Sequence, residues 1–198
     1  MSIGIPGVLA LVLSSALQAA APSFQGETAC GGKPKGTACW RELSNRPGCH
    51  VWTSNHEPDA SVTWTAECSK GVAQGTGTLK WAWDEDRETV ETTGRLRNGK
   101  RHGRWVMHWA DGGVSEGTFA EGQRHGRWAE RWTNGTFGEG RYVQGRRQGR
   151  WVIRDGYGTT HEGSYRDGKQ HGKWVARRDG RVVGEAKFVE GKGRWVDK

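Results

Sequence analysis

The sequence predicts an all-β protein: an elongated, single-layer antiparallel sheet of β-hairpin repeats, with a small disulfide-containing β cap at its N-terminal end. Three observations predict this fold. A 23-residue unit recurs from Gly94, Gly117, Gly140 and Gly163, and a fixed period of this length is typical of repeat arrays. Only 33% of the residues are hydrophobic, whereas 12 Trp and 32 Gly supply large buried rings and tight turns. All four cysteines precede the regular repeats.

The N-terminal segment has the pattern of a secretory signal. Residues 3–21 carry no charge, and the apolar run at 8–13 is followed by small residues that end in Ala19, Ala20 and Ala21. This pattern indicates a signal peptide over residues 1–21, cleaved near Ala19–Ala21, although its first part lacks Lys and Arg. The alternatives are an uncleaved membrane anchor and an N-terminus that starts too late. We therefore expect the mature chain to be secreted or periplasmic.

Residues 22–70 form a segment rich in Cys and Trp. Its cysteines are Cys30, Cys39, Cys49 and Cys68, with no C-x-x-C pair, so a zinc site is not expected. An even number of cysteines behind a signal peptide favours disulfides in an oxidising compartment. Four cysteines allow three pairings, among which the sequence does not choose. Our working pairing is Cys30–Cys39 with Cys49–Cys68.

Two further features are expected before the regular repeats. Trp40, Trp52 and Trp64 should pack around the disulfides in the β cap, although a recognition surface of their own is the alternative. Residues 71–93 keep several Gly, Leu and Trp positions of the repeat without its exact spacing. We expect this segment to be a degenerate repeat that caps the array, which then occupies residues 94–198.

Each repeat is expected to form one hairpin and a return turn. In the second copy, an apolar residue, Phe119, lies in the first strand and Trp128 begins the second. Gly122 and Gly126 bound the connection between them, which is a hairpin signal. The corresponding strand residues of the other copies, the last of them shortened, are Leu96 and Trp105, Tyr142 and Trp151, Tyr165 and Trp174, and Phe188 and Trp195.

The strand pattern predicts two chemically different faces, because successive side chains point to opposite sides of a sheet. If Phe119 and Trp128 are paired and no bulge intervenes, Glu116 falls opposite Arg131 on the other face. One face is then aromatic and the other carries Glu/Arg pairs, each worth about 0.2–1 kcal/mol, so aromatic burial must provide most of the stability. The same arithmetic predicts Glu139 opposite Arg154 and Glu162 opposite Arg177.

The repeats carry the positive charge of the chain. Residues 94–198 hold 23 Lys+Arg and 12 Asp+Glu, a net charge of +11, against −3 for residues 1–93. Because equivalent residues recur about every 10 Å, basic turn residues should form a stripe suited to an acidic protein, anionic lipid or acidic polysaccharide. The secretory route argues against nucleic acid, and charged turns that only solvate a thin sheet are the other interpretation. The candidate partner-binding residues are Arg101, Arg104, Arg124, Arg127, Arg146, Arg147, Arg150, Lys169 and Lys173.

The sequence contains no pattern of catalytic, metal-binding or cofactor-binding residues. His102, His125 and His171 occupy one repeat position, but residues about 10 Å apart cannot share an ion whose ligands lie about 2.1 Å away. The acidic run at 84–88 lacks the ligand spacing of a calcium loop. We expect no enzyme, no cofactor and no metal site; an enzyme with its site within residues 22–93 is the remaining alternative.

The pattern G-x-[FY]-x-x-G-x-x-H-G-x-W, which recurs over residues 94–195, resembles the MORN repeat in its bacterial variant with Trp after the second Gly-x. The resemblance implies an elongated antiparallel sheet of hairpins and a non-catalytic scaffold for protein contacts, with anionic-lipid binding by some members. Residues 39–68 resemble, more loosely, a Cys/Trp module that precedes such repeats in secreted bacterial proteins. A related class of cytoplasmic antitoxins does not fit the signal and the cysteines.

The expected function follows from these observations. We expect a non-catalytic interaction or scaffold protein of the cell envelope or exterior that binds a protein partner through the repeat sheet. The alternative is an envelope-binding module that docks a basic edge on anionic lipid or glycan.

Overall fold

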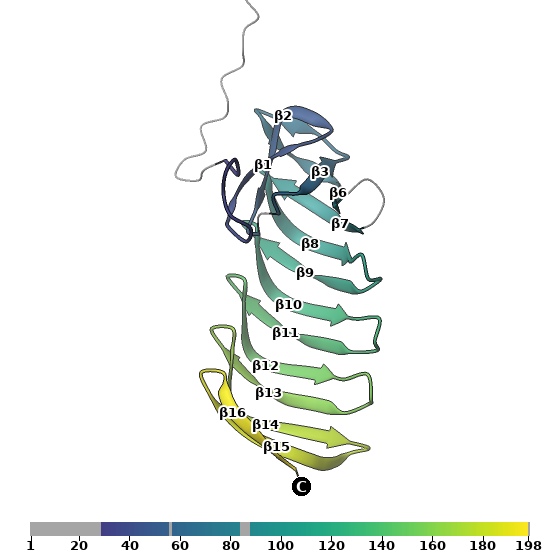
Figure 1. The fold of residues 1–198 in the computed structure, drawn as a ribbon, viewed down its shortest axis with the longest axis vertical. Helices are drawn as coiled ribbons and strands as arrows, with labels where there is room; N and C mark the ends of the chain where they lie inside the picture. Colours follow the sequence, from purple (N-terminus) through teal and green to yellow (C-terminus); the bar gives the residue numbers. More distant parts are fainter. Residues whose placement is uncertain (1–28, 56, 84–87, 198) are drawn as a thin grey trace, which may run out of the picture.

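The computed structural model describes residues 29–55, 57–83 and 88–197. The expected signal peptide lies outside these residues. The described chain confirms the all-β prediction: a 12-stranded sheet runs in the order β16 to β6 and then β3, and a 4-stranded sheet has the order β1-β2-β5-β4. Figure 1 shows the large sheet as an elongated ladder with the small sheet at its N-terminal end. No helix in the described part of the chain is long and apolar enough to span a membrane.

The strands of the repeats follow one another in the sheet in chain order, each antiparallel to the next. The small sheet consists of β1 (Cys39–Leu43), β2 (Arg46–Thr53), β4 (Cys68–Ser69) and β5 (Val72–Ala73). The large sheet consists of β3 (Ala60–Trp64), β6 (Gly75–Trp83), β7 (Glu88–Arg97), β8 (Lys100–His108), β9 (Val114–Ala120), β10 (Gln123–Arg131), β11 (Phe137–Val143), β12 (Arg146–Arg154), β13 (Thr160–Arg166), β14 (Lys169–Arg178), β15 (Arg181–Val189) and β16 (Lys192–Asp197).

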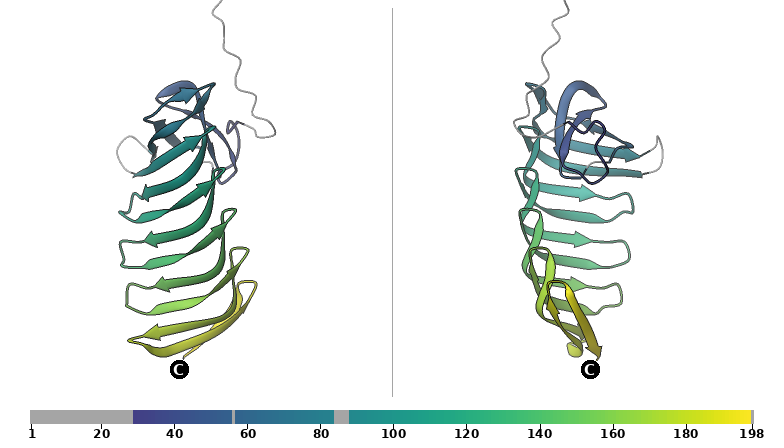
Figure 2. Two further views of the ribbon diagram at one scale, coloured as in Figure 1. Left: turned by 180° about the vertical axis from the view of Figure 1, so that it is seen from behind. Right: turned by 60° about the vertical axis from the view of Figure 1, so that its left-hand side comes forward.

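The small sheet and its flanking loops, hereafter the cap, contain both disulfides of the expected pairing. Cys30 is joined to Cys39 and Cys49 to Cys68, with Cα–Cα distances of 5.0 and 6.1 Å. Figure 2 shows that the cap lies at the N-terminal end of the large sheet, so most of the repeats form a single layer. The working pairing from the sequence is therefore confirmed.

The tryptophans of the cap attach it to the repeats. Trp40 lies against Gly99 and Trp52 against Gly122, so closely that a Cβ on either glycine would be 2.4 Å from the ring. The N–H of Trp52 also donates to the carbonyl oxygen of Gly99 at 2.9 Å. Trp64 differs from the expectation, because its strand β3 pairs with β6 of the large sheet and its ring stacks on Trp105 at 6.4 Å between centroids.

The hairpin in each repeat is tighter than the sequence suggested. Glu121 and Gly122 both have positive φ, 47° and 81°, which is the conformation of a two-residue type I′ turn. Gly126 also has a positive φ, 70°, but lies inside β10, where the pairing with β9 shifts between His125 and Trp128. This is a β-bulge with glycine in the left-handed conformation. The two glycines that were expected to bound one connection therefore belong to two different elements.

The bulge changes the predicted cross-strand pairs. Glu116 lies opposite Ala129 instead of Arg131, and Phe119 is not paired with Trp128. Glu139 pairs with Val152 instead of Arg154, and Glu162 with Val175 instead of Arg177. These predicted pairs are wrong because they assumed a regular ladder. The displacement is two residues, and strand side chains alternate with a period of two, so the predicted division into two faces is retained.

The aromatic face holds the core of the array. Trp128 and its three equivalents in the full repeats are 0% exposed. Neighbouring rings meet edge to face, with 5.1 Å between the centroids of Phe119 and Trp128 and 5.3 Å between those of Tyr142 and Trp151. Each such contact adds about 0.5–1.5 kcal/mol beyond area burial. Because the rings continue from repeat to repeat, each copy stabilises the next.

The glycine that begins each repeat makes room for the buried tryptophan. A Cβ on Gly117 would lie 2.3 Å from the ring of Trp128, and the corresponding distances at Gly94, Gly140 and Gly163 are 2.2–2.3 Å. In the shortened last copy the position holds Ala186, paired with a Trp195 that is partly exposed. Burial of the indole therefore depends on the missing side chain.

The substitution Gly117→Ala tests this dependence. We expect it to lower the free energy of unfolding by about 1–3 kcal/mol, because the added methyl group displaces a fully buried ring in a packed core. The matched control is Gly138→Ala, whose Cβ would meet its nearest atom at 3.5 Å and which should change the stability little. Urea denaturation followed by tryptophan fluorescence measures both. Equal midpoints for the two variants would contradict the argument.

Candidate functional site

The nine candidate basic residues are divided by the structure into three groups. The first group lies on the face opposite the aromatic core, hereafter the ion-pair face. There each cation pairs with the glutamate that ends its own repeat, so a ladder of ion pairs exists but with different cations from those predicted. The pairs are Arg104–Glu116 (2.7 Å), Arg127–Glu139 (2.7 Å), Arg150–Glu162 (2.8 Å) and Lys173–Glu185 (3.1 Å). Pairing with Glu139 through a hydrogen bond and its charge raises the pKa of Arg127.

The second group, Arg146 and Lys169, is exposed and immediately follows the hairpin turns of its repeats. Of the nine candidates, these two lie at the turn edge, where Lys100 and Lys192 hold the same position in the first and last copies. The edge therefore carries less charge than the count of Lys and Arg indicated, because most of the other cations lie on one face or the other.

The third group, Arg101, Arg124 and Arg147, lies partly buried on the aromatic face, at the same position of three successive repeats. Each guanidinium lies over the tryptophan of its own repeat. The distances to the ring centroid are 5.4 Å for Arg101, 4.4 Å for Arg124 and 4.3 Å for Arg147. Cation–π contacts of this kind are favourable and leave the charge to be balanced by other groups.

A single buried carboxylate balances two of these charges. Glu130, which is 3% exposed, accepts hydrogen bonds from Arg124 at 2.5 Å and from Arg147 at 2.8 Å. The hydroxyl of Tyr142 donates to the same carboxylate at 3.1 Å and accepts from both arginines. The sequence argument did not single out Glu130. Its position two residues after Trp128 was the signal, because that spacing places it on the aromatic face.

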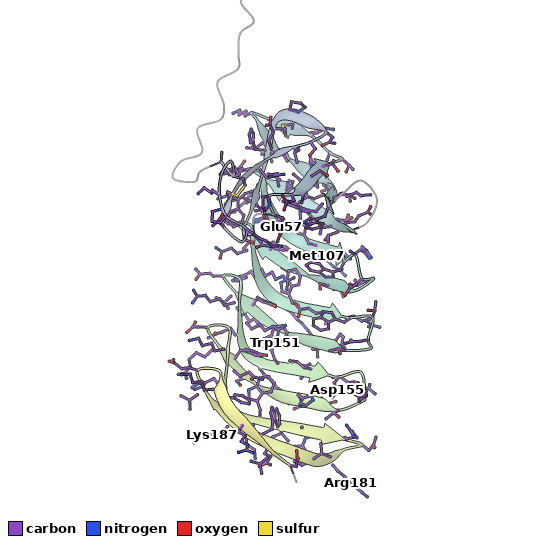
Figure 3. All side chains as sticks on the ribbon, viewed as in Figure 1. Glu57, Met107, Trp151, Asp155, Arg181 and Lys187 are labelled. Atoms are coloured by element: carbon purple, nitrogen blue, oxygen red, sulfur yellow. A yellow bond between two sulfur atoms is a disulfide. The ribbon has the colours of Figure 1, made fainter. Side chains whose placement is uncertain are left out.

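A groove of about 1050 Å³ lies over the aromatic face beside this cluster. One wall comes from Thr53, Ser54, Asn55 and Glu57 of the cap, and the floor comes from strands β6 to β12 and their connections. Glu57 and Met107, which both line the groove, are labelled in Figure 3. Its size is close to that of ligand-binding sites, which are typically lined by apolar and aromatic groups with a few polar ones. Its aromatic lining consists of Trp81, Trp83, Trp109, Phe119, Trp132 and Tyr142.

Some charged residues of the groove have ion-pair or hydrogen-bond partners within the protein, and others do not. Glu57 pairs with Lys35 at 2.8 Å, and the side chain of Asp111 accepts the N–H of Gly113 at 2.9 Å. Arg124 is held by Glu130. Arg101 also lines the groove, and its Nε is buried without a hydrogen-bond partner. Among the described residues, the groove thus combines an aromatic surface with two arginines that have no carboxylate partner, the exposed Arg146 and the more buried Arg101.

The described residues bring no three His, Cys, Asp or Glu side chains together as metal ligands. His102, His125 and His171 lie in β8, β10 and β14, in separate repeats as the sequence indicated.

Comparison with known families gives one match. The MORN repeat model matches residues 93–114, 116–137 and 161–173, which correspond to the copies that begin at Gly94, Gly117 and Gly163. No curated protein matches the chain. MORN repeats are generally non-enzymatic modules that interact with proteins or membranes. The chain therefore carries three stretches that match the MORN repeat, within an all-β array whose aromatic face bears a groove.

Proposed function

We propose that this is a non-catalytic interaction protein, secreted or periplasmic, that binds a protein partner through the groove on its aromatic face. The observation that carries the proposal is the lining of the groove, where Trp83, Trp109 and Trp132 are partly exposed rather than covered by the sheet. Tryptophan and arginine dominate the energetically important centres of protein interfaces, because they bury much surface around a specific polar contact.

The two disulfides support the compartment. Cys30–Cys39 and Cys49–Cys68 hold the cap together, and disulfides of this kind persist in oxidising environments such as the periplasm or the cell exterior. The cap also supplies one wall of the groove, so the binding surface depends on a segment that needs such an environment.

Docking of a basic edge on anionic lipid or glycan is the competing function. It has less support, because four of the nine candidate cations pair with glutamates on the ion-pair face and two more share Glu130. Binding of that kind is electrostatic and weakens as added salt shortens the screening length, from about 10 Å at 0.1 M to about 3 Å at 1 M.

The test is affinity capture from envelope extracts at low and high salt, with the disulfide-intact protein. We expect Trp132→Ala to weaken binding of the captured protein at least about thirty-fold, the loss of one central aromatic contact worth 2 kcal/mol. The matched control is Tyr157→Ala, because this aromatic residue is 88% exposed and lies outside the groove. Purified partner and calorimetry give the affinities. Unchanged affinity in Trp132→Ala, or binding only to anionic vesicles at low salt, would refute the proposal.

A further inference from the structure

The three arginines of the aromatic face provide a comparison within one molecule. Glu130 pairs with both Arg124 and Arg147. Glu130 and Arg124 belong to the same repeat, and Arg147 belongs to the next one. The hydroxyl of Tyr142 accepts hydrogen bonds from both arginines. These two guanidinium groups therefore have an anionic and a neutral oxygen partner supplied by the protein.

Arg101 has neither partner, because the corresponding positions hold apolar residues. Glu130 lies opposite Gly138, and the equivalent places in the sheet are taken by Met107, opposite Ser115, in the repeat of Arg101 and by Leu79, opposite Thr92, on the strand before it. The ring beside it is Phe119, at 5.4 Å, which lacks the tyrosine hydroxyl. Among the described residues no carboxylate pairs with Arg101, and its Nε remains buried and unbonded.

An arginine in this position is electrostatically costly. Burial, and then the charge of Arg124, lower the pKa of Arg101 to about 10, so the group is still protonated at neutral pH. A buried polar group without a partner costs free energy that any suitable partner recovers. The groove brings such a partner within reach, since Arg101, Met107 and Phe119 all line it.

The rest of the groove indicates what carries the anion. Trp83 and Trp109 are partly exposed and line the same groove as Arg101, so they offer aromatic surface for an apolar group attached near the carboxylate. The groove is also lined by Gln123 and Gln144. Their side-chain amides both donate and accept hydrogen bonds, as peptide groups do, whereas a lipid phosphate only accepts.

We infer that the groove binds a segment of a partner protein in which an acidic side chain stands next to an aromatic or aliphatic one. The carboxylate pairs with Arg101 in the way that Glu130 pairs with Arg124, and the apolar neighbour lies on the tryptophans of the groove. This inference rests on the proposed function and adds the chemistry of the partner. A charge-assisted pair with arginine is both strong and geometrically specific.

The decisive variant is Met107→Glu. It places a carboxylate where the next repeat has Glu130, so Arg101 becomes paired from within and the site is closed without removal of any charged group. Arg101→Met removes the anchor itself. The matched control is Arg104→Met, in the same strand but on the ion-pair face, where Arg104 contacts Glu116. Circular dichroism and thermal midpoints establish whether each variant is folded. If Arg101→Met does not fold, Met107→Glu still tests the inference.

The probe is a displayed library of random seven-residue peptides, selected on the disulfide-intact full-length protein. We expect wild type and Arg104→Met to enrich peptides with Asp or Glu beside an aromatic or aliphatic residue, and Met107→Glu and Arg101→Met to lose this enrichment. A resynthesised peptide with its acid changed to the amide should bind at least about ten-fold weaker by calorimetry, because a charge-assisted contact is lost.

Several outcomes would overturn the inference. These are enriched peptides without an acid, equal enrichment on Met107→Glu, no enrichment, or binding of phosphatidylglycerol vesicles in place of peptides. The two proposals fail separately. If a captured partner binds Met107→Glu as tightly as wild type but does not bind Trp132→Ala, the proposed function is supported and the role of Arg101 is refuted.

Discussion

Replacement of Trp128 by alanine is expected to lower the free energy of unfolding by about 3–5 kcal/mol, the cost of removing a large buried aromatic side chain. Trp128 is 0% exposed and contacts the rings of Phe119 and Tyr142 at 5.1 and 5.9 Å. Its indole N–H donates to the carbonyl oxygen of Thr118 at 3.0 Å. The substitution therefore leaves a cavity, removes two ring contacts and leaves one carbonyl without its donor.

The effect should spread beyond one repeat, because each copy of an array is stabilised mainly by its neighbours. Hydrogen exchange is expected to show reduced protection in β9 to β12, the strands whose rings contact Trp128 or each other. The matched control is Trp195→Ala in the last copy, where the indole is partly exposed and has ring contacts with Phe188 and His161. Urea denaturation gives the two free energies. A cost for Trp128→Ala no larger than that for Trp195→Ala would show that the aromatic ladder is not the main source of stability.

The substitution Glu130→Gln is expected to cost about 3–5 kcal/mol, as for other buried ion pairs from which one partner is removed. Glu130 is 3% exposed and pairs with Arg124 and Arg147, whose side chains are 22% and 27% exposed. The amide leaves both guanidinium groups without a carboxylate in a largely desolvated place. Most of the cost therefore comes from the uncompensated charges rather than from the lost attraction.

The control for Glu130→Gln is Glu139→Gln, which removes a carboxylate 2.7 Å from an exposed arginine. Arg127 is 81% exposed in its side chain, so water replaces the lost partner and the stability should change little. A double variant, Glu130→Gln with Arg147→Met, is expected to recover part of the stability, because it removes one of the unpaired charges. Equal effects of the two single glutamine substitutions would contradict the assignment of Glu130 as a buried counter-ion.

Properties that depend on the order of residues within one repeat could be predicted from the sequence. The hairpins, the aromatic face and the position of glutamates on the opposite face all follow from the 23-residue period and from the alternation of side chains along a strand. The disulfide pairing was chosen among three and is confirmed. These features are local, or they repeat, so several copies of the same pattern support each prediction.

The cross-strand partners could not be predicted in the same way. Gly126 looked like the end of a turn, but it is the bulge residue that moves the register by two. That shift takes Glu116 away from Arg131, and its ion-pair partner is Arg104, on the neighbouring strand β8. A glycine is compatible with a turn or a bulge, and only the pairing of complete strands decides between them.

The fold class, the two faces and the repeat unit of the array could be predicted from the order of residues alone, because each follows from a short-range pattern that recurs. Which charged groups have a partner depends instead on how the strands pack together. Glu130 pairs with two arginines, whereas Arg101 has Met107 and Phe119 where the next repeat has Glu130 and Tyr142, and the cap forms one wall of the groove at this place. Such a site depends on which residues of separate repeats meet in space. The period of the sequence does not change along the array, so the period does not indicate where the site lies.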